Sequence, residues 1–157
     1  MNDTLKLIIA ESEVHFEDGK KLFMEYAASL PIDLAFQRFE EELDTVRDQY
    51  GPPLGVLVLA YAGARAVGCA GVRSKGQGIA ELKRMYVQPE FRGHHLGRLL
   101  LERSVSTARD LGYGKLRLDT LASMTSARRL YESFGFRIIE AYYDNPHADA
   151  IYMEKTL

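Results

Sequence analysis

The sequence predicts an α/β protein of the α+β kind, with a mixed, mostly antiparallel central sheet and helices packed against it. Apolar segments that alternate with polar residues, typical of strands, recur along the chain, and amphipathic helical segments separate some of them. One such helix lies between the expected strands at residues 80–87 and 116–120. A crossover of that length favours a parallel pair, whereas the short turns elsewhere favour antiparallel pairs.

The first half of the chain is expected to form a strand, two helices and a hairpin. Apolar and polar residues alternate over residues 5–9, which indicates a strand. Apolar residues recur at helical spacing over residues 15–30, and Pro31 ends that helix. A second helix is expected to carry on one face Phe36, Phe39, Leu43 and Val46. Strands over residues 55–61 and 66–73 are joined by a short Gly-containing turn and form the hairpin.

The second half is expected to add a strand, a long helix and then shorter elements. A strand over residues 80–87 is followed by a helix over residues 97–111, which Gly112 ends. That helix is expected to turn toward the core Leu96, Leu100, Ala108 and Leu111. The remaining elements are a strand at 116–120, a helix at 126–134 and strands at 136–142 and 150–155. The expected order is therefore β-α-α-β-β-β-α-β-α-β-β.

Length and composition indicate one globular domain that spans residues 1–157. The chain has 20 basic and 22 acidic residues, so we expect no nucleic-acid partner, and it has no apolar run long enough for a membrane. Cys69 is the only cysteine and lies in an apolar run, which favours a buried core residue over a nucleophile. The four histidines lack ligand spacing, so no metal is expected. A cytoplasmic protein, monomeric or homodimeric, is the expectation.

The segment 86–100 is the most informative part of the chain. It combines an apolar strand, a Pro turn, a basic loop with Gly93 and Gly97, and an amphipathic helix. The first amides of a helix have no intrahelical acceptor, and the helix dipole adds partial positive charge, so such a loop binds anions. Arg92 and Arg98 add charge. The segment matches neither the P-loop nor the dinucleotide fingerprint, which has Gly where His95 stands. An ordinary surface loop is the alternative.

Three segments in this order resemble the GNAT superfamily of acyl-CoA-dependent N-acyltransferases, and the resemblance covers essentially the whole chain. They are the strand, loop and helix start at 82–97, the strand at 116–119, and the A-x-x-L-Y-x-x-x-G-F pattern at 127–136. The sequence departs from the family pattern at two positions. His95 stands where the family has a Gly, and Met124 stands where many members have Asn.

The resemblance implies a binding site for acetyl-CoA. It implies that the parallel strand pair splays apart, that the pantetheine arm lies in the gap, and that the Tyr86 or Val87 amide polarises the thioester carbonyl. The residues that it implies for cofactor binding are Met85, Tyr86, Val87, Arg92, Gly93, His94, His95, Leu96, Gly97, Arg98 and Ser126. For Met85 and Val87, core packing of the side chains is compatible with this role.

The same resemblance assigns catalytic candidates. Tyr131 matches a family tyrosine whose hydroxyl points at the thioester sulfur, and its alternative role is packing beside Leu130 and Phe134. Glu81 begins the fourth strand, where some similar enzymes place a carboxylate that deprotonates the amine through a water, and its alternative is a solvated strand end. The acceptor pocket is expected to include Phe36, Phe39, Tyr142, Tyr143 and Asn145.

The function expected from these observations is acetyl transfer from acetyl-CoA to a primary amine, by direct attack in a ternary complex. The acceptor is a small molecule or peptide that the sequence does not identify. A different class of function, an acyl-CoA-binding sensor domain without turnover, is the alternative. His95 and Met124 favour that alternative, whereas Tyr131 and Glu81 favour an enzyme.

Overall fold

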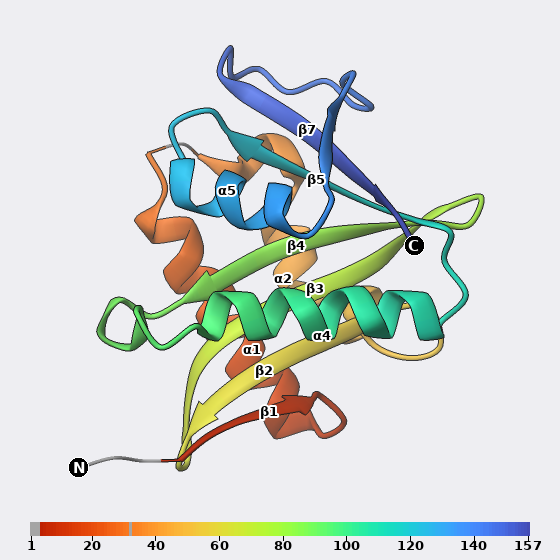
Figure 1. The fold of residues 1–157 in the computed structure, drawn as a ribbon. Helices are drawn as coiled ribbons and strands as arrows, with labels where there is room; N and C mark the ends of the chain where they lie inside the picture. Colours follow the sequence, from red (N-terminus) through yellow and green to blue (C-terminus); the bar gives the residue numbers. More distant parts are fainter. Residues whose placement is uncertain (1–3, 32) are drawn as a thin grey trace.

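The computed structural model describes residues 4–31 and 33–157, which form a seven-stranded sheet with helices on both faces. In sheet order the strands are β1 (Leu5–Ile9), β2 (Val56–Ala62), β3 (Arg65–Gly76), β4 (Ile79–Val87), β5 (Lys115–Leu121), β7 (Ala150–Thr156) and β6 (Arg137–Ile139). The helices are α1 (Glu13–Ser29), α2 (Phe39–Asp44), α3 (Val46–Tyr50), α4 (Leu96–Asp110) and α5 (Thr125–Ser133), with short 3-10 turns at Leu34–Gln37 and Pro89–Phe91. Helices α4 and α5 cover one face, and α1 to α3 cover the other (Figure 1).

The sheet is antiparallel except at its centre, where β4 and β5 run parallel. Their pairing comprises three residue pairs, from Ile79 with Lys115 to Glu81 with Arg117. Beyond these pairs the two strands diverge, so that β4 continues beside β3 while β5 continues beside β7 (Figure 1). The expected fold class, with its splayed parallel pair, is confirmed.

Two apolar cores hold the helices against the sheet. On one face, the Leu96, Leu100 and Ala108 side chains of α4 are buried, as expected. On the other face, Phe23 of α1 and Tyr50 of α3 meet edge to face, with ring centroids 5.4 Å apart. Cys69 is completely buried, as its apolar surroundings in the sequence predicted.

Three boundaries differ from expectation. The expected second helix is divided: Arg38 adopts a left-handed conformation before α2, and Thr45 separates α2 from α3 with non-helical angles. Leu111 was expected in the core but is 41% exposed, because α4 ends at Asp110 and the chain turns at Gly112 with a φ of +93°. The expected strand at 136–142 pairs with β7 only at residues 137–139, since the following residues leave the sheet edge.

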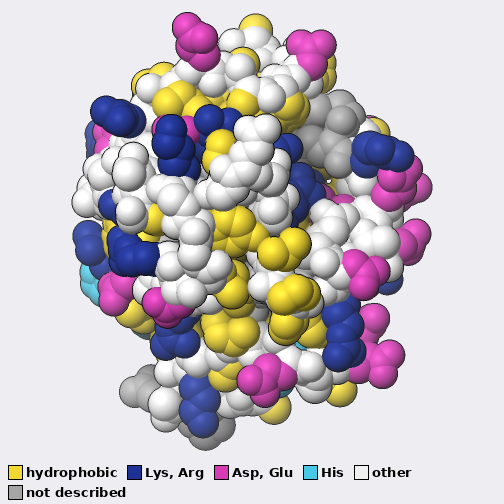
Figure 2. All heavy atoms as spheres, turned by 90° about the vertical axis from the view of Figure 1, so that its right-hand side faces the viewer, with side chains coloured by type: hydrophobic (Ala, Val, Ile, Leu, Met, Phe, Trp, Pro, Cys, Tyr) yellow, Lys and Arg dark blue, Asp and Glu magenta, His cyan; other side chains and the backbone are white. Residues whose placement is uncertain are grey.

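The end of the molecule that carries the C-terminus shows side chains of both charge signs, with hydrophobic side chains between them (Figure 2). This mixture agrees with a net charge of −2. Within residues 4–31 and 33–157, no helix is both long and apolar enough to cross a bilayer. The same residues include no cluster of three or more His, Cys, Asp or Glu side chains suited to holding a metal ion.

Candidate active site

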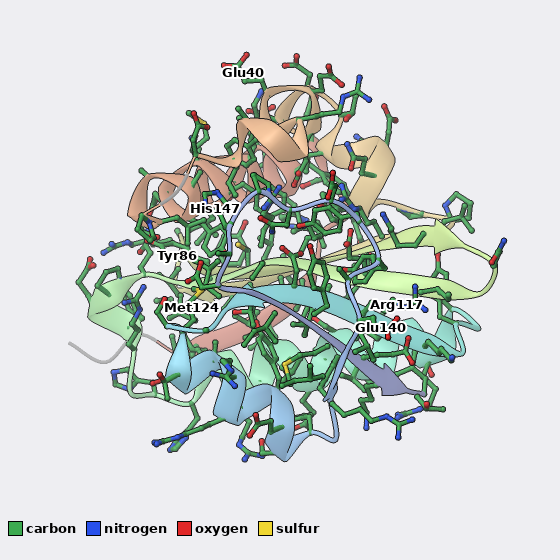
Figure 3. The ribbon with its side chains drawn as sticks, turned by 90° about the horizontal axis from the view of Figure 1, so that it is seen from above. Glu40, Tyr86, Arg117, Met124, Glu140 and His147 are labelled. Atoms are coloured by element: carbon green, nitrogen blue, oxygen red, sulfur yellow. The ribbon has the colours of Figure 1, made fainter. Side chains whose placement is uncertain are left out.

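A cleft of about 690 Å³ opens where β4 and β5 diverge. Its walls are the end of α1, the end of β4, the loop before α4, and the first turns of α4 and α5. It is lined by Tyr26, Ser29, Met85, Tyr86, Val87, Phe91, Arg92, Gly93, His95, Leu96, Gly97, Arg98, Ser123, Met124, Thr125, Ser126, Ala127 and Leu130. Every residue expected to bind the cofactor is in this lining except His94. In Figure 3, Tyr86 and Met124 lie toward one end of the sheet, whereas Arg117 and Glu140 lie toward the other.

The start of α4 gives the cleft an end with backbone amides that have no intrahelical acceptor. The amides of Leu96, Gly97 and Arg98 belong to the first turn and have no intrahelical acceptor, and the N-cap residue His95 makes no side-chain cap bond. The helix dipole adds partial positive charge at the same place. A Cβ on residue 97 would lie 3.7 Å from Leu130 Cδ2, which is ordinary contact, so the fold itself does not require glycine there.

Two arginines border this end of the cleft. Arg92 Nε donates a hydrogen bond to the Val87 carbonyl oxygen at 3.0 Å, and its guanidinium lies 5.9 Å from the centroid of the Tyr86 ring. The Arg98 guanidinium lies 5.3 Å from the centroid of the Phe134 ring. The contacts that hold both cations beside the cleft are thus with a carbonyl oxygen and aromatic rings, and none of these contacts is with a carboxylate.

The two departures from the family pattern both lie in the cleft lining. His95 has a φ of +60°, a left-handed conformation that glycine adopts without strain and other residues adopt at a cost of about 1–2 kcal/mol. This conformation is the physical reason why a glycine suits the position. Met124 is the N-cap residue of α5, and its sulfur accepts a hydrogen bond from Thr120 Oγ1 at 3.6 Å.

A second, smaller cavity of about 80 Å³ adjoins the cleft. The two share Tyr26, Met85, Met124 and Ala127. The rest of the smaller cavity is lined by Leu30, Leu34, Leu82, Lys83, Arg84, Leu118, Asp119, Thr120, Leu121, Tyr131 and Asn145. We call it the acceptor cavity, after the role that we propose for it below. Tyr131 and Asn145 both line it.

Tyr131 combines a packed ring with an unengaged hydroxyl. Its ring meets Phe136 at a centroid distance of 5.8 Å, and the residue is 8% exposed. The hydroxyl makes no hydrogen bond to any described residue. Burial raises the pKa of Tyr131, and so does the negative charge of Asp119, so the hydroxyl keeps its proton at neutral pH. Tyr131 can therefore donate a hydrogen bond to a group bound in the acceptor cavity.

A bulge in β4 places Arg84 beside the same cavity. The pairing of β3 with β4 shifts between Cys69 and Gly71, and Arg84 there has a φ of +58°. The Cys69 thiol donates a hydrogen bond to the Arg84 carbonyl oxygen at 3.2 Å. Arg84 Nε and Nη2 donate to the two carboxylate oxygens of Glu42 on α2, at 3.0 and 2.7 Å. This bidentate ion pair holds the bulged residue in its unusual backbone conformation.

The Glu42 carboxylate is also bonded by the Tyr50 hydroxyl, at 2.9 Å. Burial alone would raise the pKa of Glu42. The hydrogen bonds and the charge of Arg84 outweigh that effect, so the pKa of Glu42 lies below its ordinary value. Glu42 is therefore ionised in the folded protein at neutral pH.

A second buried ion pair starts from β4 at Lys83. Lys83 Nζ donates to Asp119 Oδ1 of β5 at 3.1 Å, and the Tyr143 hydroxyl donates to Asp119 Oδ2 at 2.6 Å. Burial would raise the pKa of Asp119, but Lys83 and Tyr143 hold it below its ordinary value. Asp119 and Lys83 both line the acceptor cavity, so its lining contains charged as well as apolar residues.

Glu81 is not brought to either cavity. It is 1% exposed at the end of β4 that pairs with β5, and its carboxylate accepts hydrogen bonds from Arg73 Nε at 3.0 Å and from the Tyr142 hydroxyl at 2.7 Å. Burial would raise the pKa of Glu81, but Lys83, Arg73 and Tyr142 together lower it. The alternative interpretation of Glu81, a solvated strand end, is wrong, because the carboxylate is buried in an ion pair with Arg73.

The residues expected around the acceptor have different positions. Asn145 lines the acceptor cavity. Tyr143 donates a hydrogen bond to Asp119 and Tyr142 donates one to Glu81, and neither tyrosine is in the lining of either cavity. Phe39 packs under Arg84, with the guanidinium 5.2 Å from the ring centroid. The side chain of Phe36 lies outside the described part of the structure. The segment 140–149, which carries His147, crosses over the sheet toward α1 and α2 (Figure 3).

Sequence reasoning missed the charged residues of the acceptor cavity. The signal was present: Lys83 and Arg84 stand in an apolar strand at the centre of the sheet, where such residues are almost never fully buried unless they are paired. Their partners could not be inferred, since Glu42 is 42 positions from Arg84 and Asp119 is 36 positions from Lys83.

Comparison with known proteins identifies the family. Residues 20–136 match the acetyltransferase (GNAT) family. An uncharacterised N-acetyltransferase of Schizosaccharomyces pombe is 42% identical over 139 residues, which are 87% of this chain and 85% of that protein. The chain belongs to the GNAT family of acetyltransferases.

Other relatives agree with this assignment. An IAA acetyltransferase of Azospirillum brasilense is 35% identical over 108 residues, or 68% of this chain and 70% of that protein. A solved acetyltransferase structure from Streptococcus agalactiae shares the fold, with a TM-score of 0.78 at 24% identity over 98% of each chain. The protein is thus an acyltransferase enzyme, and its family implies acetyl-CoA as co-substrate. The start of α4 and the cleft beside it fit that molecule.

Replacing Gly97 by Asp is expected to weaken CoA binding at least tenfold, or by about 1.4 kcal/mol. Two like charges about 4 Å apart repel by about 4 kcal/mol at an effective dielectric constant of about 20. Calorimetric titration with CoA measures the effect, and Gly97→Asn is the neutral control of the same shape. An acidic residue in the first turn does not weaken the helix, so the fold is expected to persist. Equal affinities for the Asp and Asn variants would contradict an anion site here.

Replacing Glu42 by Gln is expected to destabilise the protein by about 3–5 kcal/mol at pH 7, because the Arg84 charge loses its buried partner. The pKa of Glu42 is lower in the folded than in the unfolded protein, so its ionised carboxylate stabilises the fold at pH values above the unfolded-state pKa of about 4.3. This stabilisation is lost as the pH falls from about 4.3 through the folded-state pKa. The variant is therefore expected to approach the parent below pH 4.

Urea unfolding at several pH values between 7 and 3 measures this difference. Glu41→Gln is the control, since Glu41 pairs with Arg38 on the surface and contributes at most about 1 kcal/mol. A difference between parent and Glu42→Gln that does not shrink in acid would show that the charge of Glu42 is not the cause.

Proposed function

We propose that this enzyme transfers the acetyl group of acetyl-CoA directly to the primary amine of a small molecule or peptide, with both substrates bound at once. One observation supports this proposal. Two cavities lie next to each other where β4 and β5 diverge, and four residues line both of them. One has an anion-binding end suited to the pyrophosphate, and the other has polar groups suited to an acceptor. A covalent acetyl-enzyme would need a nucleophile, and the chain's one cysteine is buried beside the β4 bulge.

The cofactor's two ends are assigned to different elements. The pyrophosphate lies on the amides of residues 93–98, between Arg92 and Arg98. The pantetheine arm follows β4 at Met85–Val87, where the strand has parted from β5 and its backbone faces the cleft. The Tyr86 or Val87 amide polarises the thioester carbonyl. Met85 and Val87 also pack against the core, so their side chains fix the strand while the backbone binds.

The bond changes define what Tyr131 does. The amine nitrogen forms a bond to the acetyl carbon, the carbon–sulfur bond breaks, and the departing sulfur takes a proton. Tyr131 donates that proton, since its hydroxyl is protonated and unengaged in the acceptor cavity, and it is reprotonated from solvent.

Glu81 does not remove the proton of the amine by direct contact in this proposal. That carboxylate has no position in either cavity lining and is held by Arg73 and Tyr142. If Glu81 is the base, the proton of the amine therefore reaches its carboxylate through intervening groups, such as the water that was expected to mediate this step.

Replacing Tyr131 by Phe is expected to lower turnover about a hundredfold or more, because general acid catalysis contributes at least that factor. The ring and its contact with Phe136 remain, so the unfolding midpoint is expected to change little. Thiol release is measured with saturating acetyl-CoA and the best acceptor from a panel of amines, and mass spectrometry identifies the N-acetyl product.

The matched control is Tyr113→Phe. The Tyr113 hydroxyl donates to the Leu54 carbonyl oxygen and is in neither cavity lining, so its loss is expected to leave turnover unchanged. Normal turnover of the Tyr131→Phe variant would contradict the proton-donor role and show that Tyr131 serves only in packing.

A further inference from the structure

The acceptor cavity is small and its lining is of mixed character. Its volume is about 80 Å³. The lining includes leucines from the residue after α1, the following 3-10 turn, β4 and β5, together with Lys83, Arg84, Asp119 and Asn145. A cavity of this size admits a few heavy atoms, so the part of the acceptor next to the reacting nitrogen comes within reach of the charged residues.

Arg84 offers donors that the protein does not use. A guanidinium has five N–H groups. Arg84 Nε and Nη2 are bonded to Glu42, whereas Nη1 donates to none of the described residues. The group is also fixed in orientation, by the bidentate pair and by the Phe39 ring. Arg84 therefore presents a buried, preorganised donor to the cavity, of the kind that binds a carboxylate.

Asp119 supplies the opposite charge in the same cavity. Its carboxylate is held by Lys83 and Tyr143. An ammonium or amine nitrogen is attracted to such a carboxylate, whereas an anionic group is attracted to Arg84. A ligand with both groups close together matches both features, and one with an amine alone leaves the Arg84 donors without an acceptor.

We propose that the acceptor of this enzyme is a small amine that carries a carboxylate next to its amino group, an α-amino carboxylate, with the carboxylate on Arg84 and the amino group beside Asp119. The inference rests on the proposed acetyl transfer to an amine and names the class of that acceptor. It makes Arg84 a specificity-determining residue in addition to its structural pairing with Glu42.

The test compares matched acceptors in the unmodified enzyme. Alanine, leucine and phenylalanine are each assayed beside the corresponding amino acid amide and the corresponding amine without the carboxylate, with saturating acetyl-CoA and detection of free thiol. We expect kcat/KM to be at least tenfold higher for the amino acid in one or more sets. The amide is the less basic amine and would react faster if the carboxylate were not recognised, so the comparison is stringent.

The outcomes separate the two proposals. Equal or better turnover of the carboxylate-free amines in every set would overturn the inference and leave acetyl transfer to amines in place. Absence of thiol release with every amine, in a protein that still binds CoA, would overturn both.

A variant tests the residue. Arg84→Lys keeps a cation for Glu42 but removes Nη1, so the preference for amino acid over amide is expected to fall toward one. The preference is a ratio measured in one preparation, so a partly unfolded sample does not alter it. Arg117→Lys is the control, because Arg117 pairs with Glu154 and is not in the cavity lining, and its preference is expected to equal that of the parent. A preference that survives in Arg84→Lys would overturn the assignment to Arg84.

Discussion

The parting of β4 and β5 is the constraint on which the rest of the structure depends. The two strands share three residue pairs and then diverge, each keeping its other neighbour in the sheet. The divergence leaves the β5 side of residues 82–87 without a strand partner and opens the sheet at its centre (Figure 1). Because β4 leads into α4 and β5 leads into α5, the starts of both helices border the same gap. The cleft therefore follows from the topology.

Buried ion pairs fix the edges of this gap. Arg84 is tied to α2 through Glu42, Lys83 to β5 through Asp119, and Glu81 to β3 through Arg73. Such pairs add little stability compared with apolar packing, but breaking one leaves an uncompensated charge. Their effect here is geometric: β4 carries a charge at three of four successive positions, and each of these charges is paired with an opposite charge on another element. The bulge at Arg84 is thereby held in one conformation.

Much of this arrangement could be predicted from the sequence, and the remainder depended on distant contacts. Periodicity and the crossover between residues 87 and 115 were sufficient for the parallel pair, and the loop with Gly93 and Gly97 was sufficient to locate the helix start that borders the cleft, where anion binding stays a prediction. The acceptor side was predicted less well. Tyr142 and Tyr143 bind carboxylates instead of lining the cavity, because the segment 140–149 packs over β4 and β5. The pairing of Glu81 with Arg73 was not predicted, since nothing local in the sequence indicates it.

The most direct test of this account is a crystal structure of the enzyme with CoA. The account predicts the pyrophosphate within hydrogen-bond distance, about 3 Å, of amides in residues 93–98. It also predicts the pantetheine arm beside the backbone of residues 85–87 and the sulfur next to the Tyr131 hydroxyl. A CoA molecule bound outside the gap between β4 and β5, or with its pyrophosphate away from the start of α4, would contradict it.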